Sequence, residues 1–107
     1  MAPSPRLRRM TDLVYAAQAL LDLERLSDFL LQSDPQAAQG TATLIFEALE
    51  ILVQHPEIGR KVPFGQRELV ISRGRTGYLA LYRFLPHLDR ILVLAIRHQR
   101  EAGYRGA

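Results

Sequence analysis

Residues 67–96 read RELVISRGRTGYLALYRFLPHLDRILVLAI, and most of the predicted sheet lies in this segment. Three runs within it, Glu68–Ser72, Tyr78–Leu85 and Arg90–Ile96, are rich in β-branched and aromatic side chains and therefore predict strands. The intervening RGRTG and PHLD are turn material. Loops this short join neighbouring strands in antiparallel fashion, because a parallel return needs a dozen or more residues. The stretch predicts an antiparallel meander of three strands.

The middle strand presents two different faces. Its side chains alternate between Tyr78, Ala80, Tyr82 and Phe84 on one face and Leu79, Leu81, Arg83 and Leu85 on the other. The last strand is apolar throughout, which is typical of a central strand that is covered on both sides. We therefore expect the last strand inside the sheet.

Upstream of the meander, the apolar pattern takes on the period of helices. Apolar side chains at spacings of three and four predict one helix over Ala16–Gln32 and a second over Pro35–His55. Asp34 suits the N-cap of the second helix, and Pro35 suits its first position, where the missing N–H is no loss. Because only a tight corner separates the helices, we expect an antiparallel hairpin. A short strand over Leu7–Val14 is expected to precede it.

These elements predict an α+β fold of order β-α-α-β-β-β. An N-terminal helical hairpin packs on a small twisted antiparallel sheet, so that each layer buries the apolar face of the other. The 107 residues match the usual size of one domain, which is expected to span residues 1–107. Residues 1–6, which begin MAPSP, are expected to be disordered.

Charge is divided unevenly along the chain. Residues 1–59 hold four arginines against eight acids, a net charge of −4, whereas residues 60–107 hold ten cations against three acids, a net charge of +7. Nine of these ten cations are arginines, whose planar fork suits phosphate and carboxylate groups. The split indicates an anionic partner, either nucleic acid or an acidic protein segment. The alternative is that the arginines only solvate the edges of the sheet.

Several functional classes find no support in the sequence. There is no cysteine for a disulfide, a zinc–thiolate site or a nucleophile, and no glycine-rich phosphate loop or metal-ligand spacing. We therefore expect neither cofactor nor metal. The arginine-bearing N-terminus lacks the apolar core of a secretory signal, and no apolar stretch approaches the ~20 residues of a membrane span. A soluble cytoplasmic protein is expected.

Several segments together carry a resemblance to a known family. They are DLERLSDFL (22–30), DPQAA (34–38), ILVQHPEIGRKV (51–62), RELVISRGRTGYLALYRF (67–84) and ILVLAIRHQREAGY (91–104). Over residues 10–104 the chain resembles the RelE/ParE superfamily of toxins from bacterial type II toxin–antitoxin systems. The order HPEIGR, REL, a strand that opens with GY, and RHQRE is typical of the ParE-like branch. The superfamily includes proteins called plasmid stabilisation proteins.

The resemblance implies one of two activities. ParE-like members poison DNA gyrase, and RelE-like members cut messenger RNA in the ribosomal A site; both are neutralised by a co-encoded antitoxin whose C-terminal segment wraps the toxin. We expect a ParE-like toxin that inhibits growth by binding gyrase and is not itself an enzyme. The alternative is a ribosome-dependent mRNA endonuclease. A third hypothesis is a toxin-like fold that is kept as an inert or as an antitoxin-binding module.

Three residues are the candidates for catalysis in an endonuclease. His98 would serve as acid or base, and Arg100 and Tyr104 would match an arginine and a C-terminal tyrosine of RelE. The set is incomplete, because Leu79 follows Tyr78 where RelE-like members carry an arginine, and ELVIS lacks the RelE lysines. The structural alternative is that His98 caps a strand end and that Tyr104 packs on the sheet.

Five arginines are the candidates for binding the target or a phosphate: Arg73, Arg75, Arg83, Arg97 and Arg100. An antitoxin segment is expected to add a strand at a sheet edge or to lay a helix along a groove, with its acids meeting the basic half. The sequence leaves open which groove is used.

Overall fold

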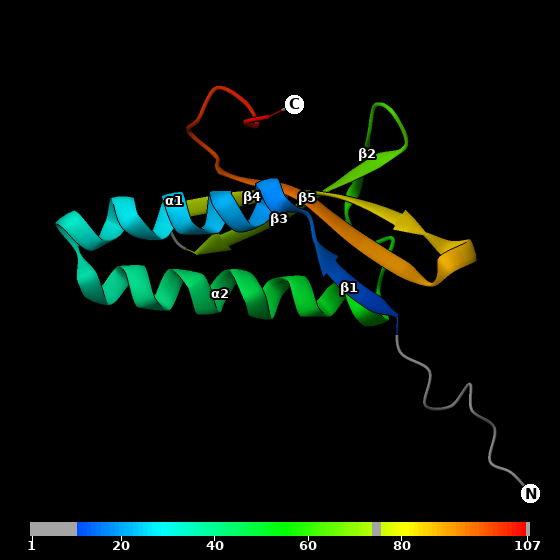
Figure 1. The fold of residues 1–107 in the computed structure, drawn as a ribbon, viewed down its shortest axis with the longest axis horizontal. Helices are drawn as coiled ribbons and strands as arrows, with labels where there is room; N and C mark the ends of the chain where they lie inside the picture. The colour runs from blue at the N-terminus through cyan, green and yellow to red at the C-terminus, as the bar shows by residue number, and fades with distance from the viewer. Residues whose placement is uncertain (1–10, 74–75, 107) are drawn as a thin grey trace, which may run out of the picture.

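The computed structural model describes residues 11–73 and 76–106 and shows two helices beside a five-stranded sheet (Figure 1). In chain order, the elements are β1 (Asp12–Tyr15), α1 (Ala17–Ser33), α2 (Pro35–Gln54), β2 (Arg60–Val62), β3 (Gln66–Arg73), β4 (Thr76–Leu85), the short 3-10 helix η2 (Pro86–Leu88) and β5 (Arg90–His98). The predicted α+β architecture is therefore confirmed. The expectation of disorder in residues 1–6 concerns residues outside the described ranges.

The sheet has the strand order β1-β5-β4-β3-β2. The antiparallel meander of β3, β4 and β5 is as predicted, and β5 lies inside the sheet. The sheet as a whole is mixed and not purely antiparallel, because β1 pairs with β5 in parallel, from Asp12 opposite Arg90 to Tyr15 opposite Val93. The helical hairpin and the meander together form the long connection that a parallel pair requires.

Two strands differ from the prediction. The first was expected over Leu7–Val14, but β1 spans Asp12–Tyr15, and residues 7–10 lie outside the described ranges. The prediction missed β2, a three-residue strand antiparallel to β3. Three residues are too few to show an alternating pattern, so periodicity cannot identify such a strand.

The helices begin and end within one residue of the predicted positions and lie side by side as an antiparallel hairpin (Figure 1). Asp34 alone forms the corner. Its N–H donates to the Leu30 carbonyl (2.6 Å) and ends α1, while its carbonyl accepts the N–H of Ala38 (3.0 Å) in the first turn of α2. The proline after it begins α2, as its fixed φ and missing N–H favour.

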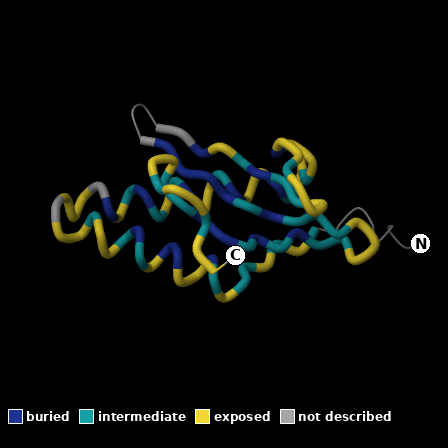
Figure 2. Tube along the Cα trace, turned by 90° about the horizontal axis from the view of Figure 1, so that it is seen from above, coloured by how far each residue is buried: buried dark blue, intermediate teal, exposed yellow. Residues whose placement is uncertain are grey.

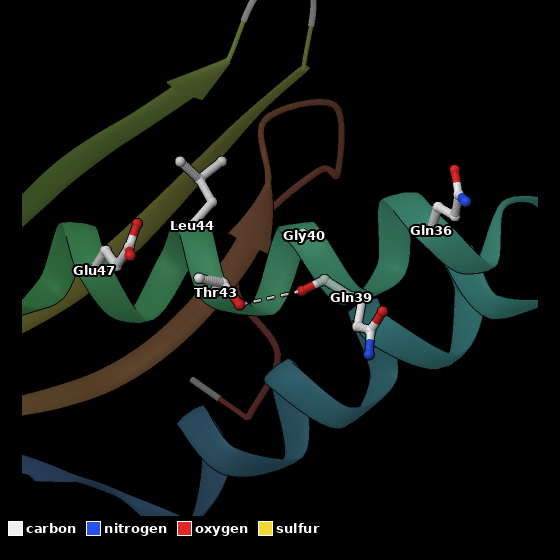
Figure 3. Close-up of a pocket in the computed structure, with 6 residues that line it drawn as sticks. All are labelled: Gln36, Gln39, Gly40, Thr43, Leu44 and Glu47. Carbon is white, nitrogen blue, oxygen red and sulfur yellow. Dashed lines mark hydrogen bonds between the residues drawn. The ribbon is translucent and has the colours of Figure 1, made fainter.

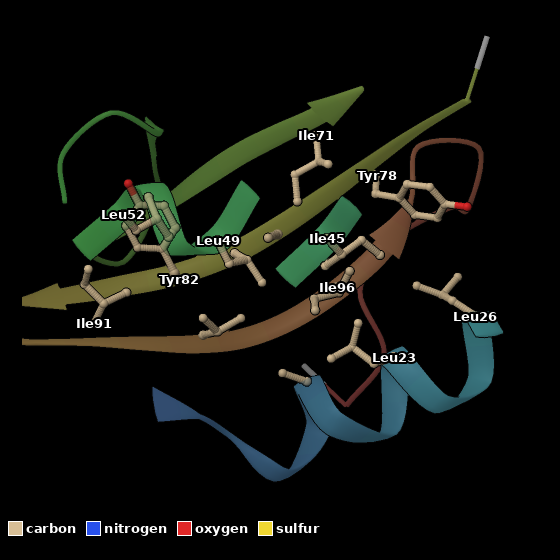
Figure 4. Packing of buried hydrophobic residues seen from close by; sticks show 13 residues of the cluster. Leu23, Leu26, Ile45, Leu49, Leu52, Ile71, Tyr78, Tyr82, Ile91 and Ile96 are labelled. Atoms are coloured by element: carbon tan, nitrogen blue, oxygen red, sulfur yellow. The ribbon is translucent and has the colours of Figure 1, made fainter. Parts of the chain in front are cut away.

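The core lies between the hairpin and one face of the sheet, as Figures 2 and 4 show. It contains Leu23 and Leu26 of α1, Ile45, Leu49 and Leu52 of α2, Tyr78, Ala80 and Tyr82 of β4, and Ile91, Val93 and Ile96 of β5. The predicted Tyr78/Ala80/Tyr82 face is therefore the one that meets the helices. We call the opposite side the outer face.

A β-bulge changes the phase of β5. Leu81 pairs with Ala95 but Tyr82 pairs with Val93, which leaves Leu94 without a partner in β4. The extra residue allows both Val93 and Ile96 to face the helices, although they are three positions apart. The uninterrupted apolar run of β5 is compatible with this shift, because either face can accept an apolar side chain.

Candidate functional site

The chain after β5 turns back over the end of the sheet, and we call residues 99–106 the C-terminal segment (Figure 1). Its first residue is tied to β4, because the Gln99 N–H donates to the Gly77 carbonyl (2.9 Å). The Gln99 side chain occupies the space that a Cβ at Gly77 would need. A side chain at position 77 would therefore displace the end of the Gln99 side chain.

Helix α1 holds the open edge of β5. Strand β1 covers β5 only as far as Val93, so the backbone of Ile96 needs other partners. The fully buried Asp22 carboxylate accepts the Ile96 N–H (2.8 Å), and Arg25 donates to the Ile96 carbonyl (3.5 Å). Two side chains of α1 thus replace a neighbouring strand.

Arg25 also fixes the C-terminal segment. Its guanidinium donates to Glu101 (2.8 Å), and the other Glu101 carboxylate oxygen accepts the His98 N–H (2.8 Å). Burial alone raises the pKa of Glu101, but the hydrogen bonds from His98 and Arg25 outweigh it, so the pKa lies below its usual value. Glu101 is therefore ionised and links α1 to the C-terminal segment.

A second attachment lies on the outer face, where the Tyr104 hydroxyl donates to Glu68 (2.6 Å). Arg60 donates to the other oxygen of Glu68, and the Arg97 guanidinium lies over the Tyr104 ring, 5.0 Å from its centre. Burial raises the pKa of Tyr104, and its hydrogen bond to Glu68 raises it further. Burial also raises the pKa of Glu68, but the bonds from Tyr104 and Arg60 lower it overall. Tyr104 therefore stays protonated and Glu68 ionised.

Of the three candidates for RNA cleavage, Tyr104 lies apart from His98 and Arg100. His98 is paired with Tyr78 on the helix-facing side, where their rings pack edge to face with centres 5.2 Å apart. Arg97, the neighbour of His98, points to the outer face with Tyr104, because successive strand residues alternate. His98 Nδ1 accepts the backbone N–H of Arg100 (3.1 Å) and so makes a local cap. These contacts match the structural alternative, in which His98 caps a strand end and Tyr104 packs on the sheet.

His98 and Arg100 instead line a cavity of about 510 Å³ between α1 and the C-terminal segment, which we call the α1–tail cavity. Its walls are Arg25, Leu26, Phe29, Leu30, Tyr78, His98, Arg100, Glu101 and Arg105. The lining includes Leu26, Phe29, Leu30 and Tyr78, together with three arginines and a single glutamate. The lining of the cavity therefore combines apolar side chains with an excess of positive charge.

The predicted anion-binding arginines are spread over the molecule. Arg83 lies near the β2–β3 turn, where a Cβ on Gly65 would come within 3.1 Å of its Nη1. Arg97 is engaged with Tyr104 and the Glu101 carbonyl, and Arg100 borders the α1–tail cavity. Arg73 ends β3, but its side chain and Arg75 lie outside what the structure describes.

The candidates taken from the sequence do not include several residues of this region, among them Arg25, Phe29, Glu68, Glu101 and Arg105. Phe29 leaves 74% of its surface exposed, which the helical pattern alone did not reveal. The sequence pattern identifies Glu68 only as the first residue of a predicted strand. The sequence does distinguish Glu68 in one respect, because residues 60–107 hold only three acids beside ten cations. A buried acid in such a half is expected to pair with arginine.

A different depression lies over α2, lined by Gln36, Gln39, Gly40, Thr43, Leu44 and Glu47 (Figure 3). Its polar groups are amides, a hydroxyl and one carboxylate, and the Thr43 hydroxyl is bonded to the Gln39 carbonyl (3.4 Å). It contains no cation and no aromatic ring. This depression is therefore a weaker candidate for an anionic partner than the α1–tail cavity.

Two further features concern the described part of the chain. No group of three or more His, Cys, Asp or Glu side chains there is arranged to hold a metal ion. Neither of its two α-helices has the length and hydropathy needed to cross a bilayer.

Comparison with a family model places most of the chain in one group. The model described as ParE toxin of type II toxin–antitoxin system, parDE, matches residues 13–103. Among curated proteins, the chain is 38% identical to Toxin RelE3 of Caulobacter vibrioides over 84 residues, which cover 78% of this chain and 89% of that protein. It is 35% identical to Toxin RelE1 of the same organism over 79 residues, covering 71% and 85% of the two chains.

Solved structures agree with this grouping. A chain of the chromosomal ParDE toxin–antitoxin system from P. aeruginosa superposes with a TM-score of 0.70 and 26% identity, covering 83% of this chain and 96% of that one. A chain of the RelBE2 toxin–antitoxin complex of Mycobacterium tuberculosis has a TM-score of 0.58 at 20% identity, covering 86% and 94%. The second likeness concerns the fold alone.

Proposed function

The chain belongs to the ParE toxin family of type II toxin–antitoxin systems, and we propose that it stops bacterial growth by binding DNA gyrase. In this proposal the protein acts by occupying its target and does not cut RNA. The observation that carries it is the separation of His98 and Tyr104 on opposite faces of the sheet. The match to the ParE family model over residues 13–103 is in keeping with the choice of gyrase.

Cleavage of RNA would require these groups to converge. A base must activate the 2′-hydroxyl, an acid must protonate the leaving group, and a cation must stabilise the phosphate, all around one reacting atom. Here the Tyr104 hydroxyl donates a hydrogen bond to Glu68 on the outer face of the sheet. His98 and Arg100 border the α1–tail cavity, on the side that faces the helices. This arrangement favours binding over cleavage.

We also propose that a co-encoded antitoxin neutralises the chain in the cytoplasm. The similar structure from P. aeruginosa belongs to a ParDE pair, and the basic half of this chain suits an acidic partner segment. The name plasmid stabilisation protein, used within the superfamily, would describe the same role for a plasmid-borne copy. Neutralisation would be measured as restored growth when the neighbouring reading frame is expressed together with the toxin.

The alternative function is endonuclease activity on the outer face. A carboxylate, a guanidinium and a phenol do gather there, from Glu68, Arg97 and Tyr104, and the curated relatives carry the name RelE. Both Glu68 oxygens are already occupied by Arg60 and Tyr104, which argues against its use as a base. This alternative predicts that Glu68→Gln and Tyr104→Phe each abolish RNA cutting.

Induced expression in a bacterial host separates the two functions. Pulse labelling would follow DNA and RNA synthesis while transcript 5′ ends and chromosomal breaks are mapped. We expect DNA synthesis to fall first, with breaks at gyrase sites and intact transcripts, and we expect the His98→Ala variant to behave like the wild type. Transcript cuts in phase with codons, lost in Tyr104→Phe, would refute gyrase binding as the basis of toxicity.

A further inference from the structure

We propose that the turn between β2 and β3 inserts the ring of Phe64 between base pairs of duplex DNA, while Lys61 and Arg83 bind the phosphates on either side. Residues 60–68 form the two strand ends and the turn, and we call them the β2–β3 hairpin. The turn projects from the sheet, at the end away from the corner of the two helices (Figure 1). The inference goes beyond the proposed function, because a protein can bind gyrase without touching DNA.

Phe64 faces solvent in a backbone conformation that does not suit it. It leaves 86% of its surface exposed, the largest fraction among the exposed large apolar side chains of the described residues. Its φ of 69° lies in the left-handed region, which bulky side chains disfavour. Neither packing nor backbone preference therefore accounts for a phenylalanine at this position. Strain of this kind is typical of residues that contact a ligand or a partner.

The hairpin that carries Phe64 is fixed to the rest of the sheet. Arg60 forms an ion pair with the buried carboxylate of Glu68. Arg67 donates to two backbone carbonyls of the preceding loop (2.8 and 3.0 Å). Pro63 restricts the turn itself, because its ring fixes φ directly before Phe64. The ring is therefore held on a preorganised support, which reduces the entropy lost on binding.

Cations lie on both faces of the hairpin. Lys61 pairs with Arg67, which pairs with the buried Tyr82, so Lys61 lies on the side that faces the helices. Arg83 follows Tyr82 and lies on the outer face, where a Cβ on Gly65 would come within 3.1 Å of its Nη1. Within the described ranges, neither Lys61 nor Arg83 has an ion-pair partner. Both charges are therefore available to a ligand.

Positive charge exceeds negative charge around the turn. Residues 57–68 hold three cations and two acids, and Arg83 adds a fourth cation from β4. The acid within the hairpin, Glu68, is buried and already bonded at both carboxylate oxygens. The other acid, Glu57, lies 3.8 Å from Arg67 and is the one exposed carboxylate in residues 57–68. This excess complements a polyanion.

The shape of the hairpin favours duplex DNA as that polyanion. A groove of the double helix admits a two-stranded β-ribbon, and minor-groove proteins insert apolar wedges such as phenylalanine between base steps. Cations on both faces suit the two phosphate backbones that border a groove. Single strands are bound on successive aromatic rings, whereas residues 60–68 hold one ring. Lysine is depleted in protein interfaces, so Lys61 near Phe64 argues against a protein pocket.

Fluorescence anisotropy with a dye-labelled, twenty-base-pair DNA duplex and the purified chain tests the proposal without gyrase. We expect Phe64→Asn to weaken binding at least tenfold, and the variant should fold because asparagine tolerates the left-handed region. Lys61→Ala and Arg83→Ala should each weaken binding and reduce the slope of log affinity against log salt by about one. The matched control is Leu31→Asn, 52% exposed on α1, which should bind like the wild type.

A second duplex that carries 2-aminopurine reports on insertion, because the fluorescence of this base rises when its stacking is lost. We expect the wild-type chain to raise the fluorescence and Phe64→Asn to leave it unchanged at saturation. Glu57→Gln should bind the duplex more tightly, because it removes the exposed negative charge beside Arg67. Circular dichroism would verify that every variant folds.

Three results would overturn the proposal. The first is a wild-type chain that does not bind the duplex, and the second is wild-type affinity in Phe64→Asn. The third is tighter binding of a twenty-nucleotide single-stranded RNA than of the duplex, which would assign the hairpin to RNA. If the wild type inhibits gyrase without binding DNA and Phe64→Asn does not inhibit it, the hairpin contacts protein and the proposal is wrong.

Failure of this inference is distinguishable from failure of the proposed function, because DNA binding is measured without gyrase. A chain that inhibits gyrase but does not bind the duplex refutes the DNA contact alone. A chain that binds the duplex through Phe64 but does not inhibit gyrase refutes gyrase as the target and supports the DNA contact.

Discussion

Tyr82 decides, at the scale of single residues, how the loop before β2 packs. Its side chain is fully buried, and its hydroxyl donates to the Pro56 carbonyl (2.8 Å) and accepts the Gly59 N–H (2.9 Å). A Cβ on Gly59 would approach the Tyr82 ring to 2.7 Å and the Glu68 carbonyl to 2.9 Å. The HPEIG sequence is thus a loop shaped around one tyrosine.

We expect Gly59→Ala to lower the free energy of unfolding by about 1–3 kcal/mol, the range typical of overpacking. The Glu68 carbonyl belongs to β3 and cannot move aside like a flexible side chain. The matched control is Gly103→Ala, because a Cβ there meets nothing within 4 Å. Urea unfolding measures both, and an equal effect of the two substitutions would contradict the packing role of Gly59.

Glu68 makes stability depend on pH. Its pKa is lower in the folded chain than in the unfolded one, because the bonds from Tyr104 and Arg60 outweigh the opposing effect of burial. The stabilisation is therefore complete above the unfolded pKa of about 4.5 and is lost as pH falls below it. We expect Glu68→Gln to flatten the acid side of the stability curve. Urea midpoints from pH 3 to 7 would show it, and an unaltered curve would contradict the account.

The edge of β5 shows, at the scale of elements, how a helix can replace a strand. Asp22 and Arg25 satisfy the backbone of Ile96 where β1 has ended, and Gln18 supports the Asp22 carboxylate (2.9 Å). The same Arg25 reaches Glu101 and so orients the C-terminal segment. Helix α1 therefore shapes both the sheet and the candidate site.

Asp22→Ala should destabilise the fold more than Asp28→Ala does. The first substitution leaves the buried Ile96 N–H without an acceptor, a loss that typically costs about 1–3 kcal/mol. Asp28 is exposed on the same helix and serves as the control. Amide exchange at Ile96 should also accelerate in Asp22→Ala. Equal stability of the two variants, with Ile96 still protected, would show that Asp22 does not hold the edge.

The β2–β3 turn contains a strained residue. Phe64 has φ = 69° and is 86% exposed, followed by Gly65 with φ = 71°. A bulky residue disfavours this left-handed region, whereas asparagine tolerates it. We expect Phe64→Asn to raise the free energy of unfolding by up to about 1 kcal/mol. Thermal unfolding measures the change, and a lower midpoint would mean that Phe64 makes contacts that outweigh the strain.

Local patterns at element scale predicted much of the fold. The period of the helices and the alternation of Tyr78, Ala80 and Tyr82 depend on neighbours in sequence, so they can be read from the chain. The parallel pairing of β1 with β5 joins residues 78 positions apart, which no local pattern records. The bulge at Leu94 is hidden for a related reason, since every residue around it is apolar.

The candidate site could be predicted only in part. Successive strand residues alternate between faces, so the sequence alone predicts that His98 and Arg97 lie on opposite faces of β5. The return of Tyr104 to Glu68 was not, because it depends on the turn at residues 99–103 and on contacts between distant strands. The α1–tail cavity likewise joins Phe29 to Arg100 across most of the chain.

The uneven charge becomes a surface property at the scale of the whole molecule. Most of the excess arginines lie on the sheet and the C-terminal segment, while most of the described acids of the first half lie on the helices. The helical layer and the sheet layer therefore differ in the sign of their net charge as well as in structure. An acidic partner is steered toward the sheet and the C-terminal end of the chain.

A supercoiling assay with purified gyrase, relaxed plasmid and the purified chain shows whether gyrase is the target. We expect the wild-type chain to inhibit supercoiling in proportion to its concentration, and we expect prior mixing with antitoxin to prevent the inhibition. The His98→Ala and Tyr104→Phe variants should inhibit equally if they fold. Full supercoiling activity at a saturating concentration of a chain that arrests growth in cells would contradict gyrase as its target.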